Sequence, residues 1–188
     1  MNRLLCHTDI TTYPADVLIY STNVQLMLSG GVGACLLQRY GRSFQADLFA
    51  QLDASGRKLA SVGDVFLTHT PGLPWKRVYH VVAADPFYHT DPEVVRRILR
   101  QCLTECSADP GISTVAMSPL GAGYGDLAFP LFLDLVSEVS QCQLQLAEVS
   151  VCCDDDDFFT ELVDHLGTLS VHWAVRENFI KYLSPGRL

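Results

Sequence analysis

The chain has 188 residues, 48% of them hydrophobic, which suits one domain with a sizeable core. Its formal net charge of −8 argues against a protein that holds duplex nucleic acid by its phosphates, because such proteins need a basic surface. No apolar stretch reaches membrane-spanning length and no signal-peptide pattern opens the chain, so we expect an intracellular protein, cytoplasmic or nuclear, with no membrane partner.

Apolar runs and helix signals alternate along the chain. In order, the patterns predict a strand over 17–20, helices over 32–41 and 43–52, strands over 62–69 and 77–83, a helix over 91–106, a strand over 114–117, a helix over 129–140, a strand over 148–152 and a helix over 154–166. Ser43 is expected to cap the second helix, and strands 62–69 and 77–83 to pair antiparallel across a turn at 71–74.

This alternation predicts an α/β fold, a three-layer α/β/α sandwich with a mixed, largely parallel central sheet. We expect one domain over 1–188, with a core at about 4–166 and a C-terminal extension, 167–188, that packs on the core. Val171, Trp173 and Val175 suit an extra strand in that extension, and Phe179 and Tyr182 a short helix.

Two glycine-rich loops follow apolar runs, Ser29-Gly30-Gly31-Val32-Gly33 and Gly121-Ala122-Gly123-Tyr124-Gly125. Glycine lets the main chain approach an anion closely, and ligands of parallel sheets gather at the C-terminal ends of the strands. The two loops therefore predict a site where backbone N–H groups hold a diphosphate.

The cysteines and aspartates do not indicate a metal site. The seven cysteines include no C-x-x-C pair and are expected to be reduced core residues. The run Asp154–Asp157 is expected to supply negative charge at a helix N-terminus. We predict neither a metal nor a cofactor.

Four motifs in order resemble those of macro domains, modules that bind ADP-ribose and in some members hydrolyse its derivatives. They are Thr8-Asp9-Ile10-Thr11, Asp16-Val17-Leu18-Ile19-Tyr20-Ser21-Thr22-Asn23, Gly30-Gly31-Val32 and Pro119-Leu120-Gly121-Ala122-Gly123-Tyr124-Gly125. The similarity spans about residues 4 to 166. It implies that the partner of this chain is ADP-ribose or an ADP-ribosylated protein.

The resemblance also implies roles for individual residues. Asp9 would accept a hydrogen bond from the adenine amino group, and the Ile10 N–H would reach a ring nitrogen. Asn23 would bind the distal ribose, the sugar beyond the two phosphates, and Tyr124 would pack beside it. The main chain at Gly30, Gly31, Val32, Gly121, Ala122, Gly123 and Gly125 would border the distal ribose and the diphosphate.

Departures from the family pattern bear on catalysis. Gly33 and Leu37 stand where one hydrolytic group of macro domains has an aspartate and a histidine, so this loop has no evident general base. His80 is expected to be a core histidine, and Asp85 a turn carboxylate. If the chain is a hydrolase, Asn23 would be its catalytic residue by orienting the ribose, while a phosphate of the ligand assists water.

Three functions therefore stay open at the level of sequence. The first is ADP-ribose binding, and the second is removal of ADP-ribose from proteins or from small ADP-ribose esters. The third is a macro fold that has lost its pocket and serves as a protein-interaction module, with Tyr20, Ser29 and the cysteine near the adenine edge as signs of decay. Cys152 or Cys153 stands where the family has an aromatic residue beside adenine, a role that Phe158 and Phe159 could take over.

Overall fold

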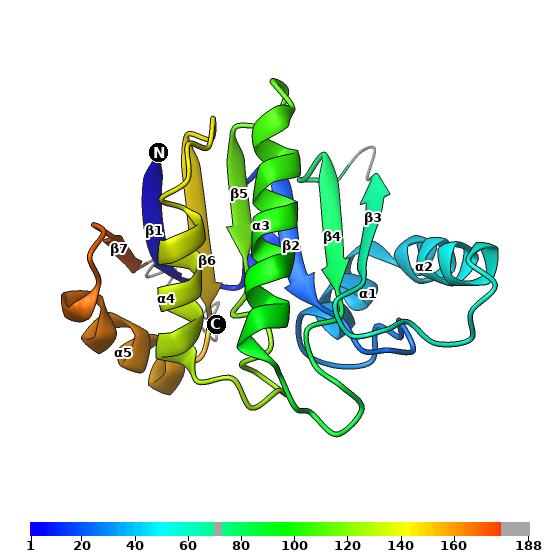
Figure 1. Ribbon diagram of the computed structural model, residues 1–188. Helices are drawn as coiled ribbons and strands as arrows, with labels where there is room; N and C mark the ends of the chain where they lie inside the picture. Colours follow the sequence, from blue (N-terminus) through cyan, green and yellow to red (C-terminus); the bar gives the residue numbers. More distant parts are fainter. Residues whose placement is uncertain (70–72, 178–188) are drawn as a thin grey trace, which may run out of the picture.

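A seven-stranded sheet forms the centre of the molecule (Figure 1). The computed structural model describes residues 1–69 and 73–177. The strands are β1 (Asn2–His7), β2 (Val17–Ser21), β3 (Val65–His69), β4 (Arg77–Val81), β5 (Thr114–Met117), β6 (Glu148–Cys153) and β7 (Ala174–Glu177). Their order is β3-β4-β2-β5-β6-β1-β7, and all neighbours are parallel except β3 and β4, which pair antiparallel as predicted.

Helices cover both faces of the sheet, so the predicted three-layer sandwich is confirmed. The helices are α1 (Gly31–Tyr40), α2 (Ser43–Ala54), α3 (Pro92–Ala108), α4 (Phe129–Val139) and α5 (Asp156–His165), with short 3-10 turns η1 (Ile10–Thr12) and η2 (Leu166–Thr168). Figure 1 shows α3 and α4 in front of the sheet and α1 and α2 behind it. No described helix combines the length and the apolar character that a bilayer crossing requires.

Each helix layer closes one apolar core. The α3 side buries residues such as Val95, Leu99 and Phe132, and the α1 side buries Leu36, Phe44 and Leu48. Strand β2 contributes to both cores, because alternate side chains of a strand point to opposite faces. The sheet is thereby fixed between two apolar layers, and the loops at the ends of its strands remain accessible for binding.

Most helix ends follow their sequence signals. Asp91 caps α3, where its carboxylate accepts from the Glu93 N–H at 2.8 Å, and Asp155 caps α5, so the aspartate run serves a helix N-terminus as predicted. The prediction for Ser43 is wrong, because Arg42 occupies the cap position of α2 and makes no side-chain capping bond.

The predictions for the cysteines and for the C-terminal extension are confirmed only in part. All seven cysteines are free, but Cys35 and Cys142 are exposed, so the prediction of burial is wrong for these two. Trp173 is buried, and its indole N–H donates to Ser137 Oγ at 3.0 Å; β7 follows it and pairs with β1. The short helix expected around 179–182, and the turn at 71–74 in large part, lie outside the described residues.

Candidate functional site

The two glycine loops meet at one edge of the sheet. Strands β2 and β5 are neighbours, and both run toward the lower edge in Figure 1, so each delivers its loop to the same place. The Gly121 N–H donates to Ser21 Oγ at 3.1 Å, which joins residues that are 100 positions apart. Ser21 stands at the end of β2, and its role as the anchor of the second loop was not predicted from the sequence.

The first loop leads into α1 and leaves the start of this helix uncapped. Gly30 is the cap residue and makes no side-chain capping bond, and Gly31 has a φ of +50°, a left-handed conformation that favours glycine. The first backbone bond of the helix runs from the Ala34 N–H to the Gly30 carbonyl at 3.2 Å. Among the described residues, the N–H groups of Gly31, Val32 and Gly33 have no acceptor.

The second loop requires glycine for steric reasons. Gly121 has a φ of +72°, and a Cβ there would lie 2.5 Å from Thr90 Cγ2. A Cβ on Gly125 would lie 2.2 Å from the Gly121 carbonyl oxygen. Within residues 1–69 and 73–177, the N–H groups of Gly123, Tyr124 and Gly125 find no acceptor, whereas the Gly121 N–H is used by Ser21.

Tyr124 joins the two loops. A Cβ added to Gly30 would lie 3.0 Å from Tyr124 Oη and 3.2 Å from Cε2, so the tyrosine ring rests on the first loop. The side chain is 70% exposed, and it therefore covers the junction from outside rather than being buried within it. The geometry brings two sets of free N–H donors and one aromatic ring to one place.

The family of the chain follows from a comparison with known proteins. The model of the Macro domain family matches residues 19–130, a range that includes the end of β2, both glycine loops and β5. The chain belongs to the macro domain family. The match ends within α4, so β6, α5 and β7 lie beyond the matched range.

Individual relatives agree with this assignment. An O-acetyl-ADP-ribose deacetylase of Enterobacter cloacae subsp. cloacae is 27% identical over 158 residues, which are 80% of this chain and 86% of that protein. The Oceanobacillus iheyensis macrodomain with ADP has a TM-score of 0.71 at 17% identity, with 86% and 87% of the two chains covered. The Trypanosoma brucei macrodomain in complex with ADP-ribose has a TM-score of 0.68 at 16% identity, with 87% and 68% covered.

In this macro domain, Asp9 is held by an ion pair that the sequence did not reveal. Its Oδ1 accepts from the Thr11 N–H at 2.8 Å, which caps η1, and its Oδ2 accepts from Arg39 at 3.1 Å. Arg39 lies in the last turn of α1 and also donates to Thr11 Oγ1 at 2.6 Å. The carboxylate is thus oriented by two elements, and Ile10 beside it is buried.

Asn23 uses most of its carboxamide within its own turn. Oδ1 accepts from the N–H groups of Gln25 and Met27 at 3.1 and 3.0 Å, and Nδ2 donates to the Met27 carbonyl at 2.7 Å. The side chain is exposed at the end of β2, close to the first glycine loop in sequence. One amide hydrogen of Asn23 is left without a partner among the described residues.

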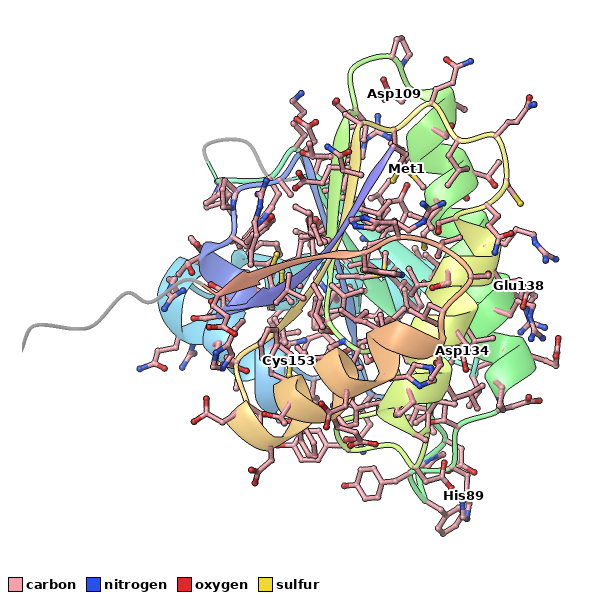
Figure 2. The ribbon with its side chains drawn as sticks, turned by 90° about the vertical axis from the view of Figure 1, so that its left-hand side faces the viewer. Met1, His89, Asp109, Asp134, Glu138 and Cys153 are labelled. Carbon is pink, nitrogen blue, oxygen red and sulfur yellow. The ribbon has the colours of Figure 1, made fainter. Side chains whose placement is uncertain are left out.

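The sequence suggested that Phe158 and Phe159 could pack beside adenine, and the structure leaves only one of these rings accessible near β1 and β6. Phe159 is buried and stacks on His7, with ring centroids 4.6 Å apart, so it has no free face for a base. Phe158 stacks on Phe129 at 4.2 Å and keeps 38% of its surface exposed. Of the two rings, Phe158 is therefore the one that a ligand can reach. Cys153, which is buried, marks this edge in Figure 2.

The other candidates for acid–base chemistry have structural roles. His80 is fully buried between Tyr20 Oη at 2.6 Å and Thr68 Oγ1 at 2.9 Å, and burial lowers its pKa to about 3. Asp85 accepts from the N–H groups of two residues of its own turn, as predicted. Gly33 is buried, and a Cβ there would lie 3.4 Å from Leu28 and 3.5 Å from Tyr20, in apolar surroundings that do not suit a carboxylate.

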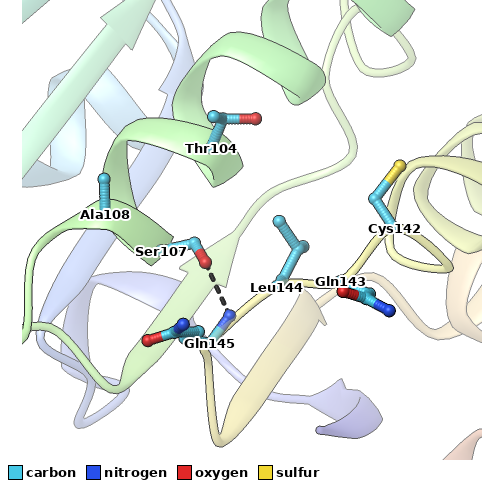
Figure 3. A pocket seen from close by; sticks show the side chains of 7 residues that line it. All are labelled: Thr104, Ser107, Ala108, Cys142, Gln143, Leu144 and Gln145. Carbon is cyan, nitrogen blue, oxygen red and sulfur yellow. Dashed lines mark hydrogen bonds between the residues drawn. The ribbon is translucent and has the colours of Figure 1, made fainter.

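A pocket of about 420 Å³ lies elsewhere (Figure 3). It is lined by the end of α3 and by the connection between α4 and β6, where the Gln145 N–H donates to Ser107 Oγ at 2.6 Å. These segments precede the first residues of β5 and β6, whereas the glycine loops follow the last residues of β2 and β5. The pocket is therefore separate from the glycine loops.

Proposed function

We propose that this macro domain binds ADP-ribose, or an ADP-ribosyl group on a protein, with the diphosphate between the two glycine loops. The observation that carries the proposal is the convergence of free backbone donors: three at the uncapped N-terminus of α1 and three in the second loop. A helix N-terminus with unpaired N–H groups attracts phosphate, and glycine lets it approach. Such a site needs no basic side chain, which fits a chain of net charge −8.

The relatives support this ligand. The Trypanosoma brucei macrodomain has been solved with ADP-ribose, and the Enterobacter cloacae relative is named as a deacetylase of an ADP-ribose derivative. By resemblance, Asp9 and Ile10 would contact adenine, and Asn23 and Tyr124 the distal ribose. The Asn23 hydrogen without a partner is the group that remains for a ribose hydroxyl.

Calorimetric titration with ADP-ribose tests the proposal with a matched pair of variants. Gly31→Asp places a carboxylate at the start of α1, and we expect affinity to fall at least about thirtyfold through repulsion of phosphate. Gly56→Asp is the control, because Gly56 also has a positive φ, +70°, and a Cβ there meets nothing within 4 Å. Equal binding by both variants, or no heat with the unaltered chain, would contradict the proposal.

Hydrolysis is a second candidate, favoured by the name of the Enterobacter cloacae relative. With glycine at 33 and leucine at 37, the first loop offers no base, so Asn23 would orient the ribose and a phosphate of the ligand would assist water. Incubation with O-acetyl-ADP-ribose and with mono-ADP-ribosylated protein tests this route. Unchanged substrate at stoichiometric protein, under conditions where ADP-ribose binds, would rule it out.

A further inference from the structure

Three exposed aromatic side chains lie beside the second glycine loop, and we call Phe87, Tyr88 and Tyr124 the aromatic ridge. Their exposed fractions are 78%, 59% and 70%, and the ring centroids of Tyr88 and Tyr124 are 6.3 Å apart. Figure 2 shows the neighbouring His89 at the end of the molecule opposite Met1 and Asp109. A cluster of solvent-exposed aromatic side chains is typical of a contact surface, because covering each ring with a partner lowers the free energy.

Hydrogen bonds hold the ridge to the glycine loop. Asp85 Oδ1 accepts from the N–H groups of Phe87 and His89 at 2.8 and 2.9 Å, and this turn keeps Tyr88 at a φ of +67°. The Asp126 N–H donates to the Tyr88 carbonyl at 3.0 Å, which fixes the turn to the chain just after the second loop. The ridge is therefore a fixed extension of the proposed diphosphate site.

A second set of bonds fastens the same junction through Thr90. Its hydroxyl donates to the Gly121 carbonyl at 3.0 Å, and its N–H donates to Asp126 Oδ1 at 2.7 Å. Hydrogen bonds from both backbone and side chains thus join the turn at 85–90 to the second glycine loop. A ligand held by the second glycine loop would meet the ridge without rearrangement of the chain.

The charges around the ridge are mainly negative. Asp85, Asp91 and Asp126 lie in or next to its loops. Asp126 pairs with His89 at 3.0 Å, a contact that lowers the pKa of this carboxyl and raises the pKa of His89. Asp85 and Asp91 form no ion pair among the described residues, so they carry the negative charge that is open to a partner. Arg96, in the first turns of α3, is already paired with Glu93 and Glu138. Aromatic faces beside carboxylates suit a guanidinium group, which stacks on tyrosine and pairs with carboxylate, and they repel further phosphates.

We propose that the aromatic ridge binds an arginine-containing segment of the protein that carries the ADP-ribosyl group. The proposal rests on the proposed function: if the distal ribose lies at Gly30 and Tyr124, the ridge stands beside the sugar through which ADP-ribose is linked to a protein. A polymer of ADP-ribose would bring additional phosphates to the acidic loops, whereas an arginine side chain brings the complementary charge.

Titration with synthetic peptides tests the ridge. One peptide carries a single ADP-ribosylated serine between arginines, and a matched peptide has alanine in place of the arginines. We expect the unaltered chain to bind the arginine peptide about three- to fivefold more tightly, the gain typical of exposed cation–π contacts. The double variant Phe87→Ser with Tyr88→Asn should lose this preference and bind free ADP-ribose as before; asparagine is chosen because it tolerates a positive φ.

The control is Phe49→Ser, which removes an aromatic ring that is 41% exposed on α2, and it should keep the preference for arginine. Equal affinity of the unaltered chain for both peptides would overturn the ridge proposal, as would a double variant that still prefers arginine. Tighter binding of an ADP-ribose oligomer than of the arginine peptide, lost in the double variant, would also overturn it. Absence of binding to free ADP-ribose would contradict the proposed function as well.

Discussion

His80 shows how a single residue can be fixed by its surroundings. Its ring lies between the hydroxyls of Tyr20 and Thr68, with Phe44 edge-on at a centroid distance of 5.9 Å. Burial lowers its pKa from 6.5 to about 3, so the imidazole is neutral in the folded chain at pH 5, whereas in the unfolded chain it is largely protonated. This histidine is therefore a neutral, hydrogen-bonded part of the core.

The titration of His80 predicts a pH-dependent stability. Between pH 6.5 and 3 the imidazole of His80 binds a proton in the unfolded chain but not in the folded chain. The free energy of unfolding therefore has its full value above pH 6.5 and falls as the pH is lowered. One proton corresponds to a slope of about 1.4 kcal/mol per pH unit. Urea unfolding between pH 7 and pH 5 measures it, above the range in which most carboxylates titrate.

The variant His80→Gln supplies the control, because glutamine can bond both hydroxyls and does not titrate in this range. It should be less stable at pH 7 but should lose most of the slope between pH 7 and pH 5. If the slope of the variant equalled that of the unaltered chain, the assignment of the proton to His80 would be wrong.

At the scale of elements, the second glycine loop depends on contacts that the sequence does not display. The pattern of glycines predicted a close approach of the main chain, but not what is approached. The two glycines differ in the structure. A Cβ on Gly125 would clash with the Gly121 carbonyl and the Thr90 hydroxyl, whereas a Cβ on Gly123 would meet nothing within 4 Å. One glycine is required by the fold, and the other is free to face a ligand.

A pair of alanine substitutions separates these two glycines. Gly125→Ala should lower the free energy of unfolding by about 1–3 kcal/mol, because its Cβ would clash with backbone, while Gly123→Ala should change it by less than about 0.5 kcal/mol. Urea unfolding of both variants at neutral pH is the measurement. A Gly125→Ala variant as stable as the unaltered chain would show that the loop can rearrange at no cost.

Strand β1 marks the limit of prediction from the sequence for elements. The alternation of strands and helices from 17 to 166 was predicted, because the helices are clearly periodic and the short apolar runs between them are bounded by turn and helix signals. The run Asn2–His7 was not predicted as a strand, since Leu4, Leu5 and Cys6 form an apolar run too short to carry a period. Its pairing with β6 joins residues nearly 150 positions apart, a contact that no local pattern encodes.

At the scale of the whole molecule, the order of the strands in the sheet brings the parts of the candidate site together. Residues of β2 and β5 lie about a hundred positions apart, and their adjacency brings the two glycine loops together. The sequence predicted both loops and their edge of the sheet, while the Asp9–Arg39 pair, the Tyr124–Gly30 contact and the aromatic ridge needed the structure. These contacts join elements whose relative positions depend on packing.

The net charge of the chain does not conflict with an anionic ligand at the glycine loops. The proposed site uses backbone dipoles and not basic side chains, so a net charge of −8 is compatible with it. The acidic loops at the ridge would add selection at the end of the ligand that leads to the carrier protein. In this proposal, affinity for the diphosphate and preference for its carrier would come from separate groups.

The most direct test of this account is an amide nitrogen–proton NMR spectrum recorded during titration with ADP-ribose. We expect the amide signals of Gly31, Gly33, Gly123 and Gly125 to shift together and to saturate at one ligand per chain. Gly56 and Gly111, which lie outside both loops, should stay in place. Shifts limited to one loop, or centred on residues outside both, would contradict the claim that two remote turns hold one diphosphate.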